Sequence, residues 1–205
     1  MSDPRFSYRC GTDHWLQLVI LEPLFEEANR CRRMIAAMMR ALNQHGIGSS
    51  IVTLPGAGES LSASSDVTFA DWIDFAAGIK ADAVASVRGS ALIDAAISAP
   101  CHWRFSPETG SRIVRDLKRT NLSGDNDGLY AGHKLGKTML DALEAATPAH
   151  VPMLRTVRLE SDAAEADTKV AGSALWRRAE PGEDDTLSNA LAADLAGWVK
   201  QCAAS

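Results

Sequence analysis

The stretch ASVRGSALIDAA, residues 85–96, is where the sequence most clearly suggests chemistry. It reads as a short apolar strand, a tight turn and a helix. A turn of this kind can present a nucleophile at its tip, and small residues must stand two positions before and after it because the turn packs against neighbouring backbone. Arg88 has Ser86 and Ser90 in these positions, whereas Ser90 would be flanked by the larger Arg88 and Leu92. We therefore place Arg88 at the tip.

An arginine at this tip excludes the ordinary covalent route of acyl transfer, because the guanidinium group stays protonated and has no usable nucleophilic lone pair. Beside a helix N-terminus, Arg88 could instead bind a carboxylate, phosphate or sulfate. It could equally form a structural ion pair with Glu22 or Glu26 from the end of the neighbouring strand, and such a pair is costly to break. The sequence leaves both alternatives open.

The elements that must position this turn alternate between strands and helices. Apolar runs predict four strands, at residues 14–23, 49–55, 81–87 and 101–105. Helical spacing of apolar residues predicts helices between them, at residues 24–48, 68–79 and 90–98. The alternation predicts an α/β fold, with a mostly parallel sheet and helices on both faces.

Residues 107–148 break this rhythm, because two predicted helices follow each other without a strand between them. We expect this segment to form a small helical cap over one edge of the sheet. The strand pattern returns at residues 153–160 and 169–176, and a final helix is expected at 186–201, with Asp184 and Asp185 as suitable caps. The expected organisation is a single domain over residues 1–205.

Composition narrows the class of protein. With 46% hydrophobic residues, a net charge of −5 and a pI near 5.5, the chain is expected to be globular and not to bind nucleic acid. No signal peptide is apparent, and no apolar run approaches the roughly 18 residues of a membrane helix, so we do not expect an integral membrane protein. The four cysteines are scattered without a metal-binding spacing, which favours a reduced cytoplasmic compartment, no metal site and no cofactor.

Three stretches in this order resemble the α/β-hydrolase superfamily: VILEPLFEEANRCRRMIAAMMRAL (19–42), IVTLPGAGES (51–60) and ASVRGSALIDAA (85–96). The first is similar to the strand whose following loop contributes to the oxyanion hole of that superfamily. The last falls where its nucleophile-bearing turn belongs. The resemblance implies an α/β-hydrolase-like fold.

The chain more narrowly resembles the exosortase A system-associated hydrolases of the type called hydrolase 2. The likeness is carried by Glu26, Glu27, Asn29, Arg32 and Arg33, by SVRGS (86–90), by AGHKLGKTMLDAL (131–143) and by GSALW (172–176). It implies a bacterial cytoplasmic protein encoded beside machinery for PEP-CTERM protein sorting and exopolysaccharide production. It implies no known substrate.

The superfamily's catalytic triad has the chain order serine, acid, histidine, with the histidine after the last strand. Glu160 or Asp162 could supply the acid. All five histidines lie before residue 151, and Trp176 and Arg177 stand about where the late histidine is sought. We therefore expect no standard triad.

The leading hypothesis is a non-catalytic protein that binds a small anionic ligand or a protein partner of the exosortase and polysaccharide system. One alternative is a true hydrolase that uses Cys31, Ser60 or Ser90 with His102 or His133. Another is a purely structural partner that buries its own apolar sheet edge or cap face against another subunit, which could be a second copy of the chain.

Candidate cleft residues are those expected near the carboxyl ends of the strands, where this architecture binds ligands. Besides Arg88 they are Glu22, Glu26, Asn29, Arg32, Arg33, Ser86, Ser90, His102 and Asp162. The plainer interpretation is that Asn29, Arg32 and Arg33 form a solvated helix face and that His102 is a hydrogen-bonded core residue.

Overall fold

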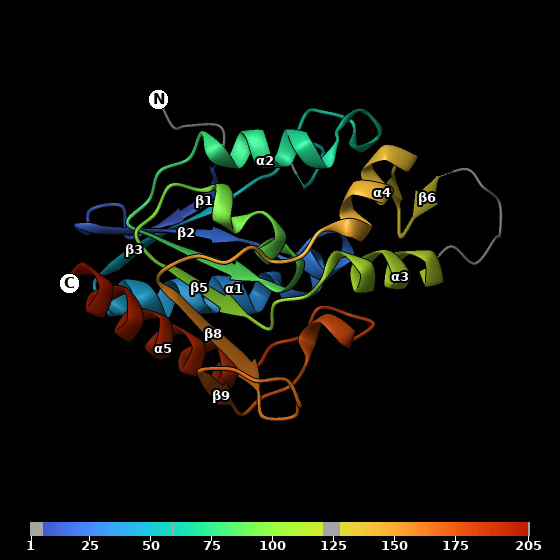
Figure 1. Cartoon of the computed structure of the whole chain (residues 1–205). Coiled ribbons are helices and arrows are strands. Elements are labelled where there is room, and N and C mark those ends of the chain that lie inside the picture. Colours follow the sequence, from blue (N-terminus) through green and yellow to red (C-terminus); the bar gives the residue numbers. More distant parts are fainter. Residues whose placement is uncertain (1–5, 59, 121–127, 205) are drawn as a thin grey trace.

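The computed structural model describes residues 6–58, 60–120 and 128–204, and within them a seven-stranded sheet is the central element (Figure 1). The strand order is β1-β3-β2-β4-β5-β8-β9. The strands are β1 (Phe6–Cys10), β2 (Leu16–Leu21), β3 (Ile47–Val52), β4 (Ala83–Val87), β5 (His102–Phe105), β8 (Leu154–Leu159) and β9 (Thr168–Val170). Only β1 pairs antiparallel with its neighbour, and the other five pairings are parallel.

Helices cover both faces of this sheet (Figure 1). On one face lie α1 (Glu26–Gln44) and α5 (Asp185–Ala203), and on the other lies α2 (Phe69–Ala77). Each helix buries an apolar stripe, so the core forms two layers, one on each side of the sheet. The expected α/β class, with a mostly parallel sheet and helices on both faces, is confirmed.

Beyond the carboxyl ends of the strands lie α3 (Gly110–Thr120) and α4 (Lys137–Ala145) (Figure 1). Two helices were predicted in residues 107–148, and both are present. The sequence predicts the second of these over residues 133–147, but it begins at Lys137 because a short hairpin of β6 (Leu129–Tyr130) and β7 (His133–Lys134) precedes it. The polar stretch at residues 121–132 is predicted to join the two helices, and residues 121–127 of it lie outside the described residues.

The prediction of a helix at residues 90–98 is wrong. Two short 3₁₀ helices stand there instead, η2 (Arg88–Leu92) and η3 (Asp94–Ala96). The Ser90 hydroxyl accepts a hydrogen bond from the Val87 N–H, and the Asp94 carboxylate binds side chains of the sheet. Such side-chain bonds compete with regular helix geometry, so the segment stays tightly folded against the strand ends.

Other boundaries differ at the edges of the sheet. The edge strand β1 was not predicted, and β9 is shorter than predicted because Leu175–Arg177 forms a 3₁₀ helix, η4. The final helix and its cap are confirmed, since the Asp184 side chain accepts a hydrogen bond from the Leu187 N–H. Within the residues that the structure describes, no helix is long and apolar enough to span a bilayer.

Close packing of α3 against α4 yields a prediction. A Cβ atom added at Gly110 would lie 1.6 Å from the backbone oxygen of Leu143. We expect Gly110→Ala to destabilise the protein by about 1–3 kcal/mol, measured by urea denaturation, because one backbone must move. Gly136→Ala is the control, since a Cβ there meets nothing within 4 Å. Equal unfolding midpoints for the two variants would contradict the close contact.

Candidate functional site

Arg88 stands at the tip of the sharp turn that follows β4. Its φ of 61° lies in the left-handed region that a residue with a side chain rarely adopts, and the residue is only 8% exposed. Ser86 and Ser90 on either side of it are completely buried. The strain of such a backbone costs of order 1–3 kcal/mol and persists only where the surroundings hold it. The structure therefore has the predicted turn, with the predicted cation at its tip.

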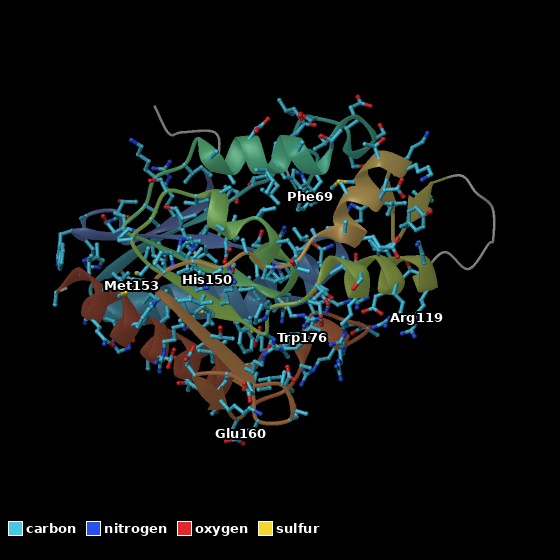
Figure 2. All side chains as sticks on the ribbon, in the orientation of Figure 1. Phe69, Arg119, His150, Met153, Glu160 and Trp176 are labelled. Carbon is cyan, nitrogen blue, oxygen red and sulfur yellow. The ribbon has the colours of Figure 1, made fainter. Side chains whose placement is uncertain are left out.

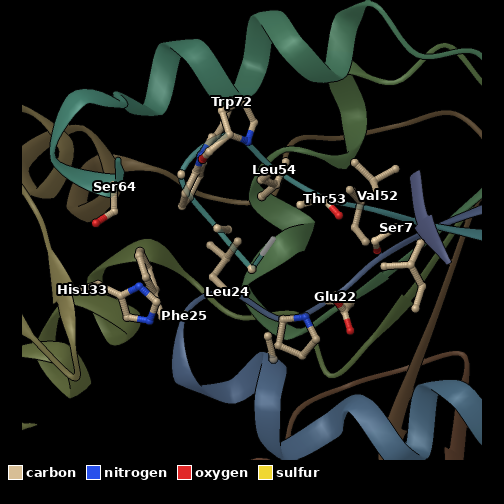
Figure 3. Close-up of a pocket in the computed structure, with 18 of the residues that line it drawn as sticks. Ser7, Glu22, Leu24, Phe25, Val52, Thr53, Leu54, Ser64, Trp72 and His133 are labelled. Atoms are coloured by element: carbon tan, nitrogen blue, oxygen red, sulfur yellow. The ribbon is translucent and has the colours of Figure 1, made fainter. Parts of the chain in front are cut away.

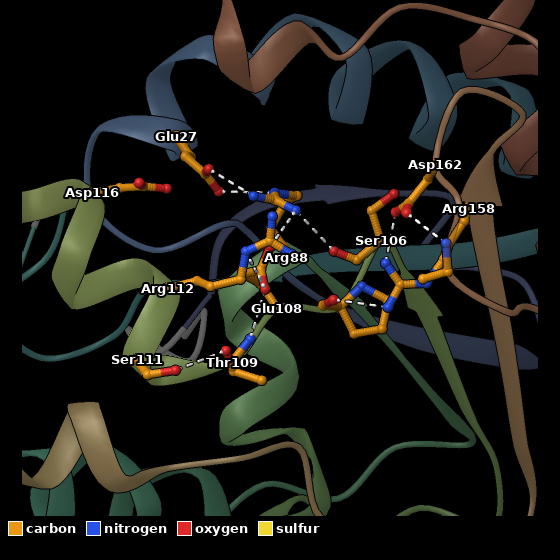
Figure 4. Close-up of polar contacts among 12 residues, drawn as sticks. Glu27, Arg88, Ser106, Glu108, Thr109, Ser111, Arg112, Asp116, Arg158 and Asp162 are labelled. Carbon is orange, nitrogen blue, oxygen red and sulfur yellow. Dashed lines mark hydrogen bonds and ion pairs between the residues drawn. The ribbon is translucent and has the colours of Figure 1, made fainter.

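The guanidinium of Arg88 is held by hydrogen bonds and ion pairs on several sides (Figure 4). Its Nε lies 3.2 Å from Glu27 Oε2, and its Nη2 lies 3.1 Å from Glu27 Oε1. Its Nη1 donates to the Ser106 carbonyl oxygen at 3.2 Å and lies 3.5 Å from Glu108 Oε2. We refer to Arg88, Glu27 and Glu108 together with Trp176, described next, as the arginine clamp.

The ring of Trp176 covers the guanidinium, with the Arg88 Cζ 4.5 Å from the ring centroid. Trp176 comes from η4, after the last strand, and also packs edge-on against Phe105 at 5.7 Å. A cation over a tryptophan face is stabilised by the ring quadrupole. The indole ring of Trp176 thus lies against the turn, and it comes from the part of the sequence in which a catalytic histidine was sought.

The ion-pair alternative for Arg88 is the one that the geometry supports, but the expected partners were wrong. The partner on α1 is Glu27, and neither Glu22 nor Glu26 bonds Arg88. Glu26 is turned outward, 40% exposed and 3.9 Å from Arg30. One helical position, about 100°, separates the two glutamates, and only the second faces the sheet.

Burial dominates the electrostatics of this clamp. It raises the pKa of the Glu27 carboxyl above its ordinary value, and the nearby Arg88 guanidinium offsets part of that rise by lowering it. Two carboxylates, from Glu27 and Glu108, already lie against Arg88, and Glu108 is also paired with Arg112 at 3.5 Å, so a further anion at Arg88 would meet like charge. The clamp is therefore built to neutralise Arg88.

A second buried ion pair lies behind the turn. Arg104 on β5 donates from Nε to Asp94 Oδ2 at 2.7 Å and from Nη2 to Asp94 Oδ1 at 2.8 Å. The Ser86 hydroxyl donates to the same carboxylate at 2.7 Å. This bidentate ion pair fixes the 3₁₀ segment after Arg88 to the central strands.

Asp162 follows β8, the position of the expected acid, but it has another partner. Arg158 Nη1 lies 2.7 Å from Asp162 Oδ2, and the Ala164 N–H donates to Oδ1 at 3.0 Å (Figure 4). Partial burial alone would raise the pKa of the Asp162 carboxyl, but these bonds lower it overall. Asp162 therefore anchors a loop and orients no imidazole.

The histidines lie apart from Arg88. His102 begins β5, at the opposite end of that strand from the turn, so its predicted place in the cleft is wrong. Burial lowers the pKa of its ring. His133 lies on β7, and His150 lies in the segment before β8, away from Trp176 (Figure 2). Within residues 6–58, 60–120 and 128–204, no hydrogen bond joins a serine or cysteine side chain to a histidine ring.

The proposed replacement nucleophiles are occupied or inaccessible. Cys31 is completely buried, and this burial raises the pKa of its thiol to about 12. The Ser60 hydroxyl accepts hydrogen bonds from the N–H groups of Gly56 and Ser62. Ser90 is buried against the Leu21 and Val87 carbonyl oxygens. Among the described residues, no group of three or more histidine, cysteine or acidic side chains could hold a metal ion.

The main pocket lies beside the turn and does not include it (Figure 3). It has a volume of about 690 Å³ and lies between the ends of β2 and β3, the start of α1, the turn at residues 55–58 and the segment around α4. Of the predicted cleft residues, three line it: Glu22, Asn29 and Arg32. The others do not: Glu26, Arg33, Ser86, Arg88, Ser90, His102 and Asp162.

The aromatic wall of this pocket is formed by Phe25, Trp72 and His133. Sequence reasoning missed Phe25 and Trp72, and it named His133 only as a possible catalytic histidine. The residues come from three separate segments: Trp72 lies in the predicted helix at residues 68–79, where its apolar spacing indicated only core packing. Phe25 carried a weak signal, because it directly precedes α1 in the segment that follows β2. Its φ of 58° was not predictable from the residue type.

Comparisons with known proteins support the fold. No family model matches the sequence, and neither does any curated protein. Among solved structures, the chain is similar to the esterase Est1E from Butyrivibrio proteoclasticus with ferulic acid bound, at 15% identity and a TM-score of 0.57 over 97% of this chain and 95% of that one. A second structure of Est1E gives 15% identity and a TM-score of 0.51, over 93% and 88%. Together with the sheet order, this likeness defines an α/β-hydrolase-like fold.

Removing the cation from the clamp should be strongly destabilising. We expect Arg88→Met to lower the free energy of unfolding by about 3–5 kcal/mol, because the largely buried Glu27 would lose its counter-ion and Glu108 would keep only its pairing with Arg112. Arg33→Met is the matched control, since its ion pair with Glu183 is 62% exposed on both sides and should contribute at most about 1 kcal/mol. Urea denaturation measures both, and a similar small loss in both variants would contradict the clamp.

The raised pKa of Glu27 predicts a pH dependence. The protein binds a proton at Glu27 more tightly when it is folded than when it is unfolded. The free energy of unfolding of the wild type therefore falls as the pH rises from the unfolded pKa of this carboxyl, near 4.5, through its higher folded pKa. The stability of Glu27→Gln relative to the wild type should therefore increase with pH across that window. Denaturation from pH 4 upward tests this, with Glu26→Gln one residue earlier as the control for loss of a charge; a flat difference would refute it.

Proposed function

We propose that this chain is a non-catalytic protein of α/β-hydrolase-like fold that binds a ligand or partner. The observation that carries the proposal is the arginine clamp: the turn that would expose a nucleophile presents Arg88, which is bonded to Glu27 and covered by Trp176. A guanidinium cannot attack an acyl carbon and give a usable intermediate. The turn has the strained backbone of a catalytic elbow, but its central side chain is buried and bonded within the protein.

The remaining parts of a triad support the same proposal. The acid at Asp162 is bonded to Arg158, and the ring after the last strand is the indole of Trp176. The alternative of a displaced hydrolase would need Cys31, Ser60 or Ser90 to meet a histidine. Each of these side chains is instead buried or bonded to backbone.

The biological setting is proposed from the sequence resemblance. Glu26, Glu27, Asn29, Arg32 and Arg33 match the exosortase A system-associated hydrolase 2 pattern. On that basis we propose a cytoplasmic protein that serves exopolysaccharide production or protein sorting. We also propose that residues 1–205 act as one unit, with residues 107–148 as its cap.

Reactivity tests the proposal. The wild type should hydrolyse no short-chain p-nitrophenyl ester above the buffer rate, and a fluorophosphonate probe should label no serine. Arg88→Ser should also remain inactive, because no histidine ring is hydrogen-bonded to this turn in the described structure. An active esterase run in parallel validates the reagents. Stoichiometric labelling of one serine, located by mass spectrometry, would overturn the non-catalytic assignment.

A further inference from the structure

The pocket beside the arginine clamp combines an aromatic wall with a cation, Arg32, that has no bonded partner among the residues that the structure describes. Its volume of about 690 Å³ lies within the roughly 300–1,000 Å³ of small-molecule sites. Most of its lining is apolar, supplied by residues such as Leu24, Leu54 and Val67. The pocket differs from the arginine clamp in one respect: among the described residues, no carboxylate is bonded to Arg32, whereas Arg88 is bonded to Glu27 and Glu108.

One end of the pocket is aromatic (Figure 3). The ring of Phe25 lies 5.8 Å from that of Trp72 and 5.4 Å from that of His133, the latter edge-on. The Trp72 Nε1 donates to the Pro55 carbonyl oxygen, so the polar atom of the indole is already satisfied. Phe25 is held at a φ of 58°, which places its ring between these two neighbours. Aromatic groups favour other rings packed edge-on or offset at such distances.

His133 adds hydrogen-bonding capacity to this end without adding charge. Burial lowers the pKa of its ring, so the neutral form, with one donor and one acceptor nitrogen, predominates at neutral pH. Among the described residues, neither ring nitrogen of His133 has a hydrogen-bond partner; the ring packs edge-on against Phe25, and the nearby Glu26 carboxylate offsets part of the lowering of its pKa.

Arg32 supplies the charge, from a face of α1 that is otherwise small. Ala28, Arg32 and Ala36 are spaced four residues apart and all line the pocket, and Asn29 lies on the same face. Arg32 is exposed at the pocket, and within the described part of the chain it forms no ion pair or hydrogen bond. The alanines leave room for a ligand group to reach it.

The spacing of the two groups along the chain favours an elongated ligand. Arg32 stands seven positions after Phe25, the residue that precedes α1, and at about 1.5 Å of rise per residue their backbone positions lie about 10 Å apart along the helix axis. Glu22 lines the same pocket, so a second acidic group on the ligand would meet a like charge.

We propose that this pocket binds an elongated aromatic monocarboxylate, with its ring between Phe25, Trp72 and His133 and its carboxylate at Arg32. The proposal rests on the proposed non-catalytic function, because the acid is retained as a ligand and is not released as a product. It separates the binding site from the turn at Arg88.

Calorimetric titration of the full chain with 6-phenylhexanoic acid tests the proposal, with 6-phenylhexan-1-ol and 6-phenylhexylamine as neutral and cationic analogues. The acid should bind at least tenfold more tightly than either analogue. Arg32→Gln should reduce the ratio of acid to alcohol affinity at least fivefold. Arg33→Gln, the same change on a neighbouring exposed residue outside the pocket, should leave it unchanged.

The aromatic end has its own variant pair. Phe25→Leu should weaken the binding of both the acid and the alcohol by at least fivefold, because it removes the protein ring that packs against the phenyl group of each ligand. Phe69→Leu is the control, since Phe69 contacts Trp72 but does not line the pocket. Equal affinity for acid and alcohol, no effect of Arg32→Gln, or no binding of the acid at millimolar concentration would each overturn the proposal.

A final arm separates the two proposals. The p-nitrophenyl ester of 6-phenylhexanoic acid should release no p-nitrophenolate above the buffer rate. Release of p-nitrophenolate together with tight binding of the acid would refute the non-catalytic function while leaving the pocket assigned. Absence of both release and binding would refute the ligand and leave the non-catalytic function standing.

Discussion

The guanidinium of Arg88 is a permanent charge almost wholly removed from water, and the surrounding elements are arranged to compensate for it. Taking such a charge out of water costs several kcal/mol unless it is paired and hydrogen-bonded. Glu27 comes from α1, Glu108 from the segment after β5, and Trp176 from η4 after the last strand. Three segments far apart in the sequence are therefore tied to one side chain, at the point where the fold would otherwise open an active site.

The second ion pair extends this constraint into the sheet. Arg104 and Asp94, with the Ser86 hydroxyl, join β4, β5 and the 3₁₀ segment after the turn. Buried polar groups of this kind are costly when half satisfied, so each member restricts the others. The turn keeps its strained backbone because the arginine clamp holds Arg88 and the Arg104–Asp94 pair holds the segment after it. The residue at its tip is not a nucleophile.

Arg88 and its partners occupy the space at the turn, and the pocket lies beside it. The pocket lies along the ends of β2 and β3, with Phe25 and Trp72 in its wall and Arg32 on α1 beside it. Its cation, Arg32, is exposed and, within the described part of the chain, is bonded to no carboxylate, whereas Arg88 is bonded to two. The two arginines thus illustrate opposite uses of the same group: one neutralised within the structure, the other available to a ligand.

The sequence alone determined the layered α/β fold, because alternating apolar periodicities of strand and helix are local patterns that survive in the structure. It also determined that Arg88 occupies the tip of the turn and that no histidine follows the last strand, since both depend only on residue order. Helical spacing also contains the choice of Glu27 over Glu26, since Glu27 lies four residues before the buried Cys31 and therefore on the same face of α1. Tertiary structure alone decided that Trp176 covers Arg88 and that Phe25, Trp72 and His133 share one pocket, because these contacts join segments that are far apart in the sequence.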